Sequence, residues 1–235
     1  MNKKTLRNTI VLSLVAIVLV VTTVLTTVAY LRESAIVTNT FTVGNVAITM
    51  DESAVNEDGE KILDSQGNPV NRVTNNHYLL QPDLTYVKDP VVHVAENSED
   101  MYLFIVAENT IRAIEDASTT KGTMKTQMEA NGWKHYKELD VNTNVYVYAK
   151  DATSDGSTVI EKEDGAVDIN VFEEFSVKKD ADVSTYGAAR VIIRAYAIQA
   201  SSFGDYGTKA ATDAAWQAAV DTFDGIVDRN TSVTP

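Results

Sequence analysis

The sequence contains no cysteine, which excludes disulfide bonds, thiolate zinc sites and cysteine nucleophiles. Proline and glycine are also scarce, with 4 and 11 among 235 residues, so the chain is neither collagen-like nor rich in linkers. The length suffices for one large domain or two small ones, and a chain of this size can bury a substantial core.

Basic side chains are few as well. The chain has 20 lysines and arginines against 33 aspartates and glutamates, which gives a net charge of −13. A protein that binds the phosphates of nucleic acid needs a basic surface. We therefore expect no nucleic-acid partner, and the composition predicts an acidic globular protein.

Residues 1–29 differ from this composition. Three basic residues stand among the first seven, and residues 10–29 carry no charge. A basic start, an apolar stretch and an exit of small residues are typical of a secretory signal peptide. We expect cleavage after Ala29, with Thr27 and Ala29 as the small residues before the cut and Tyr30 as the new first residue. The alternative is a retained membrane anchor, because about 20 apolar residues span a bilayer.

Cleavage would change the charge balance and the location of the chain. It removes the three basic residues, so that 17 basic and 33 acidic side chains remain and the net charge is −16. Such a surface suits a secreted protein and repels anionic lipid. We therefore expect contact with a membrane only before cleavage.

The remaining sequence has mainly strand patterns. Apolar residues alternate over residues 41–50, with a change of parity at Gly44-Asn45 that predicts a glycine-assisted bulge. Apolar side chains on both faces of residues 101–107 predict a central strand. Further strands are expected at residues 91–94, 145–149, 169–177 and 191–200. Residues 96–100 are expected to join the strands at 91–94 and 101–107 as a hairpin loop.

Two segments have helical periodicity instead. Residues 119–131 place Met124 and Met128 on one face, and residues 208–226 place Trp216 on an apolar stripe, so we expect these side chains to pack in the core. The sequence therefore predicts a mainly β fold, a jelly-roll-like β-sandwich with a few short helices and one late amphipathic helix. We expect a single sandwich domain over residues 41–235.

Residue patterns typical of catalysis or metal binding are missing from the sequence. The three histidines, His77, His93 and His135, stand in no zinc-hydrolase motif, and the chain has no nucleophile elbow or phosphate loop. The loop from Asp151 has Lys162 where a calcium loop needs an acidic ligand. Paired acids such as Glu173-Glu174 are interpreted as a solvated surface. We therefore expect no enzyme activity, no catalytic or metal-binding residue and no cofactor, with weak calcium binding by acidic loops left open.

The junction after the signal peptide carries a more specific pattern. It reads T-N-T-F-T-V-G-N-V and comprises Thr38, Asn39, Thr40, Phe41, Thr42, Val43, Gly44, Asn45 and Val46. Two later blocks agree with it, Lys88-Asp89-Pro90 with the strand and loop that follow, and residues 191–200 ahead of the Trp216 segment. With these blocks, the sequence resembles the TasA/camelysin family, which Gram-positive bacteria export through a dedicated SipW-type signal peptidase. It departs from the family pattern at residues 31–33, where leucine, arginine and glutamate stand.

The resemblance implies a secreted structural subunit of biofilm-matrix fibres, located in the extracellular matrix or at the cell surface. In that family, the freed N-terminal segment of one subunit adds a strand to the sheet of its neighbour. Here the donor arm would be residues 30–40, with Tyr30, Leu31, Ile36 and Val37 as anchors at the polymer interface. The implied partners are further copies in a head-to-tail homopolymer, an accessory fibre protein and the signal peptidase. We expect deletion of the arm to abolish filaments and to spare the fold.

Two alternatives from other classes stay open. The first is a secreted or surface metallopeptidase of camelysin type, against which the missing zinc-ligand spacing weighs. The second is a monomeric surface adhesin or an accessory protein that anchors fibres. A subunit is expected to grow into polymers, whereas an adhesin is expected to stay one species.

Overall fold

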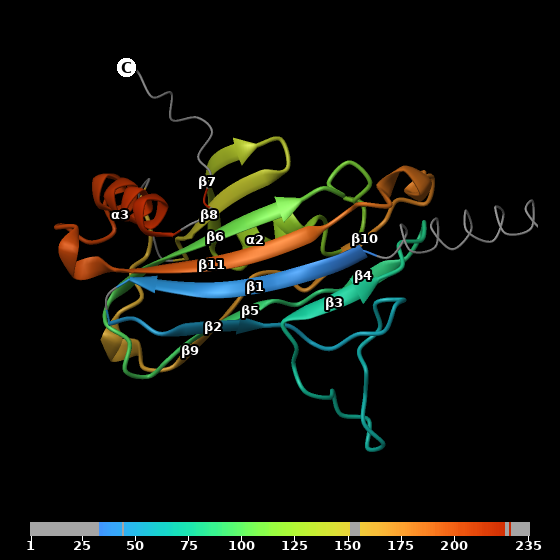
Figure 1. The fold of residues 1–235 in the computed structure, drawn as a ribbon, viewed down its shortest axis with the longest axis horizontal. Coiled ribbons are helices and arrows are strands. Elements are labelled where there is room, and N and C mark those ends of the chain that lie inside the picture. Colours follow the sequence, from blue (N-terminus) through green and yellow to red (C-terminus); the bar gives the residue numbers. More distant parts are fainter. Residues whose placement is uncertain (1–32, 44, 151–155, 224–225, 227–235) are drawn as a thin grey trace, which may run out of the picture.

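In a computed structural model of the chain, the described residues are 33–43, 45–150, 156–223 and 226. They form a long, mainly β molecule with helices at its periphery (Figure 1). The strands are β1 Glu33–Val43, β2 Ile48–Asp51, β3 Asn75–Tyr78, β4 Thr85–Val87, β5 Val91–Val94, β6 Met101–Asn109, β7 Trp133–Asp140, β8 Thr143–Tyr148, β9 Val167–Asn170, β10 Glu174–Ser176 and β11 Val191–Gln199. The α-helices are α2 Met124–Ala130 and α3 Lys209–Thr222.

The main sheet has six strands in the order β3-β1-β11-β6-β8-β7. Its centre is the antiparallel pair of β6 and β11, which runs in unbroken register from Met101 opposite Gln199 to Asn109 opposite Val191. Leu103, Phe104 and Ile105 of β6 are fully buried, because both faces of this sheet are covered. The predicted central strand and the predicted late strand are therefore confirmed.

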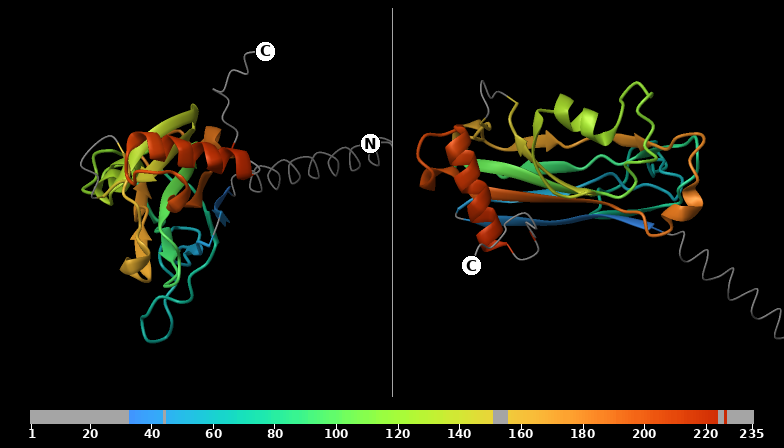
Figure 2. Two further views of the ribbon diagram at one scale, coloured as in Figure 1. Left: turned by 90° about the vertical axis from the view of Figure 1, so that its left-hand side faces the viewer. Right: turned by 90° about the horizontal axis from the view of Figure 1, so that it is seen from above.

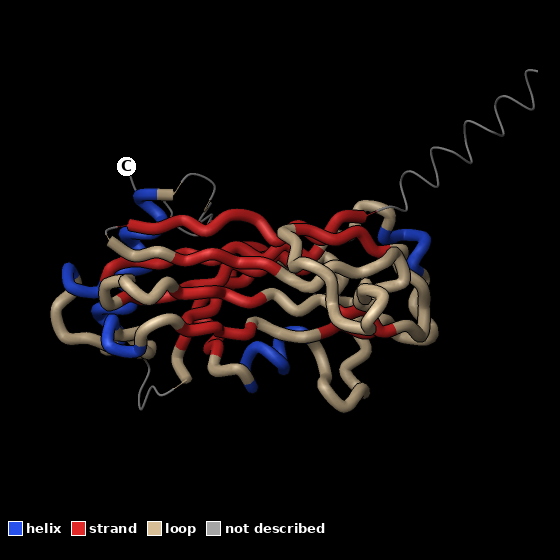
Figure 3. The backbone as a smooth tube through the Cα atoms, turned by 90° about the horizontal axis from the view of Figure 1, so that it is seen from below, coloured by secondary structure: helices blue, strands red, loops and turns tan. Residues whose placement is uncertain are grey.

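A second layer faces the main sheet. It consists of the three-stranded sheet β2-β5-β9 and the two-stranded ribbon β10-β4. The larger apolar core lies on this side and joins β2, β5, β6 and β11 through side chains such as Ile48, Val92, Leu103 and Ile193. Strands of both layers run along the long axis of the molecule (Figure 3). The predicted mainly β sandwich is confirmed.

Helix α3 covers the other face of the main sheet near one end of the long strands (Figure 2). Trp216 is 3% exposed and packs on Phe104, with ring centroids 5.4 Å apart. Thr208 caps the helix by accepting a hydrogen bond from the backbone amide of Ala211 at 3.2 Å. The predicted late amphipathic helix is confirmed, although it ends at Thr222, earlier than we expected.

Several predicted elements take a different form. Residues 41–50 do not form one bulged strand: the chain leaves the main sheet after Val43 and enters the second sheet at Ile48. Strands β5 and β6 lie in different sheets, so the loop between them is a crossover and the predicted hairpin is wrong. The strand expected at residues 169–177 is divided into β9 and β10, which pair in different sheets.

Three strands escaped prediction because their sequences are polar or short. β3 reads N-N-H-Y and lies at one edge of the main sheet, where only alternate side chains are buried. β7 is the opposite edge, and its register with β8 shifts twice, which disrupts the edge for further pairing. β4 has three residues and pairs with β10. A polar edge strand carries little of the apolar periodicity on which sequence reading depends.

Candidate functional site

Strand β1, which follows the expected cleavage site, occupies a slot inside the main sheet. It pairs antiparallel with β3 from Glu33 opposite Tyr78 to Ile36 opposite Asn75. It then pairs parallel with β11, and its last residue Val43 lies opposite Ile198. The strand thus has a neighbour on each side, and it crosses the boundary between residues 40 and 41 at which we expected the arm to end.

The position of β1 changes one expectation. Residues 33–40 were expected to form an arm that the sandwich does not need. Instead they belong to the same strand as residues 41–43, and their removal would leave β3 without its partner and β11 without its pairings to Val37 and Thr40. Unpaired backbone groups in the middle of a sheet are costly, so deletion of the arm is no longer expected to spare the fold.

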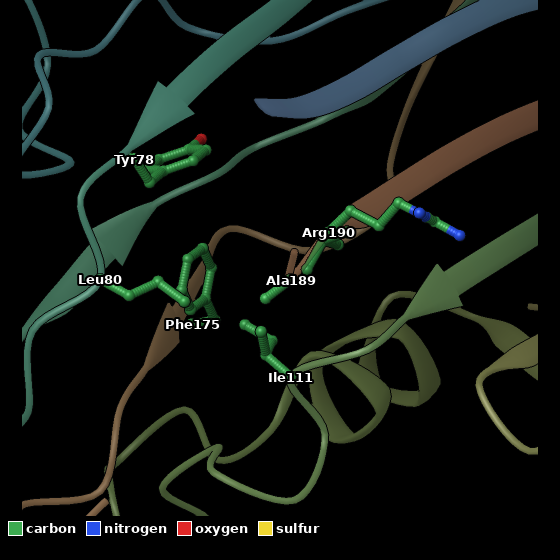
Figure 4. Close-up of a pocket in the computed structure, with 7 residues that line it drawn as sticks. Tyr78, Leu80, Ile111, Phe175, Ala189 and Arg190 are labelled. Atoms are coloured by element: carbon green, nitrogen blue, oxygen red, sulfur yellow. The ribbon is translucent and has the colours of Figure 1, made fainter. Parts of the chain in front are cut away.

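A small apolar opening borders the slot where β1 begins (Figure 4). Tyr78 of β3 and Phe175 of β10 form one side, and Ile111 and Ala189 form the other. The opening holds about 20 Å³, room for little more than one water molecule. Tyr78 is fixed there, because its hydroxyl donates to the carbonyl of Val87 at 2.9 Å and its ring lies edge-on to Phe175 at 5.6 Å. These contacts hold Tyr78 in place at the end of the slot where β1 begins.

The connection between β1 and β2 is tied to the crossover loop that leads from β5 to β6. The backbone amide of Ala47 donates to the hydroxyl of Ser98 at 2.8 Å, and that hydroxyl donates back to the Ala47 carbonyl at 3.0 Å. The amide of Glu99 donates to the Asn45 carbonyl at 3.1 Å. Val46 is 5% exposed. The family-like residues Asn45 and Val46 thus hold the chain where it passes from one sheet to the other.

The Lys88-Asp89 block lies in a buried cluster of charges behind β3. The Nζ atom of Lys88 lies 2.8 Å from Oε2 of Glu52, and both side chains are fully buried. Burial lowers the pKa of Lys88 below its ordinary value, despite the neighbouring carboxylate. Asp89 accepts hydrogen bonds from the amide and hydroxyl of Ser53 at 2.6 and 2.7 Å and from Lys61 at 2.8 Å. The block thus joins the segments on either side of β3.

The three histidines lie on separate strands. His93 on β5 stands between two carboxylates, with Nδ1 2.7 Å from Asp168 and Nε2 3.0 Å from Asp51. Partial burial opposes the charged ring, but the hydrogen bonds from both carboxylates raise the pKa of His93. His77 is exposed on β3, and His135 contacts Asn144 at 2.9 Å. Although His93 contacts two carboxylates, no group of three or more His, Asp or Glu side chains in the described residues is arranged so that it could hold a metal ion.

The paired acids Glu173 and Glu174 share one cation. Both accept from Nζ of Lys121, at 2.6 and 3.0 Å, on the surface beside β10. The two neighbouring carboxylates therefore form a surface ion pair with Lys121. Such exposed pairs contribute little to stability, typically about 0–1 kcal/mol.

A cavity of about 280 Å³ lies between α2 and the main sheet. Met124 and Met128 are buried there, as predicted, and Phe172 and Ile193 belong to the apolar part of the lining. Burial raises the pKa of the Tyr146 phenol, which also lines the cavity, to about 12. The rest of the lining is polar or charged and includes Arg112, Glu115, Lys125 and Asn144. Burial raises the pKa of Glu115, whose carboxylate accepts a hydrogen bond from the backbone amide of Met124 at 2.9 Å.

The predicted site residues are only partly within the described structure. The cleavage residues Thr27, Ala29 and Tyr30, the anchor Leu31 and Gly44 lie outside the described residues. β1 contains the other anchors and most of the family-like pattern, namely Ile36, Val37, Thr38, Asn39, Phe41, Thr42 and Val43. The structure pairs one of the two later family-like blocks, β11, with this pattern. The other block is linked to β3 instead, because Lys88 contacts Glu52, which accepts a hydrogen bond from Asn76 of β3.

No protein-family model, no curated protein and no solved structure matches the chain. The likeness to the TasA/camelysin family therefore stays a prediction. Among the helices of the described residues, none has the length and apolar character to cross a membrane, and the expected signal peptide lies outside those residues.

Proposed function

We propose that this chain is a secreted structural subunit of extracellular matrix fibres, and that copies polymerise head to tail by exchanging β1. The observation that supports the proposal is the position of β1. The segment directly after the expected cleavage site is a long strand whose first part pairs with β3 and whose second part pairs with β11. A strand held in this way can be replaced by the same strand from another copy.

Exchange requires no new kind of interface. The β1 of a second copy offers the same backbone donors and acceptors in the same register, so β3 and β11 can accept it in place of their own β1. Only residues 44–47 separate β1 from β2, and a short connecting segment favours the exchange of an element between copies. A copy that receives one strand and donates another forms a head-to-tail contact that extends into a filament.

Signal-peptide cleavage would then control assembly. While residues 1–29 hold the chain at the membrane, β1 is tethered directly beside them. Cleavage frees the end of β1, so that the strand can leave its own slot and reach another. The dedicated signal peptidase is the partner that this route requires, and the family resemblance implies an accessory fibre protein as a further partner.

A cysteine pair across β1 and β3 tests the exchange. Ser34 lies opposite His77, an exposed residue, and neighbouring strands stand about 4.8 Å apart, within the range that a disulfide bridges. Because the chain has no other cysteine, the S34C/H77C pair is unique. We expect oxidation before assembly to lock β1 in its own slot and to prevent fibres. We expect oxidation after assembly to link successive copies into a ladder on non-reducing gels.

The matched control places the pair where no exchange is proposed. Glu108 of β6 lies opposite Thr143 of β8, so E108C/T143C should give only intramolecular disulfides before and after assembly. If fibres of S34C/H77C oxidise only to monomers, β1 stays in its own copy and the exchange is wrong. If the purified mature chain remains one species under all conditions, the adhesin alternative replaces the fibre subunit.

A further inference from the structure

Three buried side chains, one on β3 and two on the segments before and after it, are arranged so that they could react with one another. Lys88, Glu52 and Asn76 are 1%, 0% and 6% exposed. The carboxylate of Glu52 contacts both of the others, through Oε2 to Nζ of Lys88 at 2.8 Å and through Oε1 to Nδ2 of Asn76 at 2.9 Å. The backbone amide of Val55 donates to Oδ1 of Asn76 at 2.9 Å, which also fixes the orientation of the side-chain amide.

We propose that Lys88 and Asn76 become joined by an intramolecular isopeptide bond, with Glu52 as the group that moves the proton. Nζ of Lys88 attacks Cγ of Asn76 and forms the new C–N bond. Glu52 takes a proton from Nζ and passes it to Nδ2 through its other oxygen. The bond from Cγ to Nδ2 then breaks, and one molecule of ammonia leaves. The step needs no oxidant, metal or cofactor.

Each part of the arrangement matches a role in acyl transfer. The nucleophile contacts its base, and the base contacts the leaving group. The Val55 amide points at the carbonyl oxygen on which negative charge develops, as an oxyanion-hole donor does. Asn76 carries both the carbonyl and the leaving nitrogen, so the three residues together contain every reacting atom.

The surroundings favour the neutral amine that the attack requires. Burial lowers the pKa of Lys88, because a charge in a water-free interior is poorly solvated. The three side chains are buried, and the ring of Tyr78 is centred 6.0 Å from Nζ.

The bond would strengthen the wall of the β1 slot. Asn76 belongs to β3, the partner of β1, and Lys88 directly follows β4. A covalent link between them fixes the edge strand β3 to the second layer, whether or not β1 is in place. The inference does not depend on the proposed fibre function, because the reaction involves one chain only.

Mass spectrometry tests the bond in the purified full chain. We expect the denatured chain to be lighter than its sequence mass by one ammonia molecule. Trypsin should fail to cut after Lys88, so residues 73–112 should appear as one looped peptide that lacks this ammonia. Fragment ions should place the link between Asn76 and Lys88. A chain of full mass that trypsin cuts after Lys88 would overturn the proposal.

Two variants and one alternative source of ammonia loss complete the test. Glu52→Gln keeps the side-chain shape but removes the base, and it should restore the full mass and the tryptic cut. Lys61→Met removes a neighbouring amine that contacts Asp89, and it should keep the ammonia loss. Loss of ammonia that maps to Asn131-Gly132 instead would be succinimide formation at that site and would contradict the proposal.

Discussion

Removal of β1 is expected to eliminate most of the free energy of unfolding. The strand has five residue pairs with β11 and four with β3. At about 0.5–1.5 kcal/mol net for each backbone hydrogen bond and about one bond per residue pair, these ladders contribute roughly 5–13 kcal/mol. A typical domain has a total of about 5–15 kcal/mol. A chain that starts at Asn45 should therefore be unfolded or only partly folded in buffer.

A peptide that supplies β1 should reverse this loss. A synthetic peptide of residues 33–43, added at about 100 times its dissociation constant, should raise the free energy of unfolding of the truncated chain by about 2.7 kcal/mol. Urea denaturation followed by circular dichroism measures the change, and a scrambled peptide of the same composition is the control. A truncated chain that is as stable as the full chain, or one that the scrambled peptide stabilises equally, would refute the role assigned to the slot.

Three further predictions concern stability and assembly. Trp216→Ala should lower the free energy of unfolding by about 3–5 kcal/mol in urea, since Trp216 is 3% exposed, whereas Val141→Ala at an exposed site should change it by less than about 0.5 kcal/mol. The raised pKa of His93 means that its ion pairs stabilise the fold fully below pH 6.5. Their contribution, at most about 1 kcal/mol, should be lost as the pH rises through the raised pKa, and His93→Gln should abolish this dependence. Fibre growth followed by light scattering should accelerate with salt, because copies of net charge −16 repel one another; slower growth would mean that attraction between opposite charges dominates.

The long strands of the main sheet were predictable because their apolar residues occupy both faces. β6 buries consecutive side chains from Met101 to Ile105, and β11 does so from Val191 to Ile193. This pattern can be read from each segment by itself. Their partners are not local. Nothing near residues 33–43 indicates that the strand pairs with β11, which lies more than 150 residues further along the chain. The crossover between β5 and β6 was mistaken for a hairpin for the same reason, because a loop sequence does not specify which sheet the next strand joins.

The candidate site could be predicted only in part. The pattern around Thr38 to Val46 drew attention to β1, but the parallel pairing that fills the slot required coordinates. Lys88 and Asp89 stood out as a block, yet Glu52 and Asn76 did not, because acidic and amide residues in a turn-rich segment are usually solvated. Their burial depends on a contact between distant residues. The chain leaves at Glu52 and returns at Val73, just before β3, where the two residues form a β-bridge that brings Glu52 and Asn76 together.

The structure of an assembled filament tests the central claim most directly. In a density map of fibres grown from the mature chain, residues 44–47 should lead from β2 of one copy to a β1 that lies between β3 and β11 of the next copy. Continuous density that returns each β1 to the slot of its own copy would contradict the account, since the copies would then be joined by some other surface.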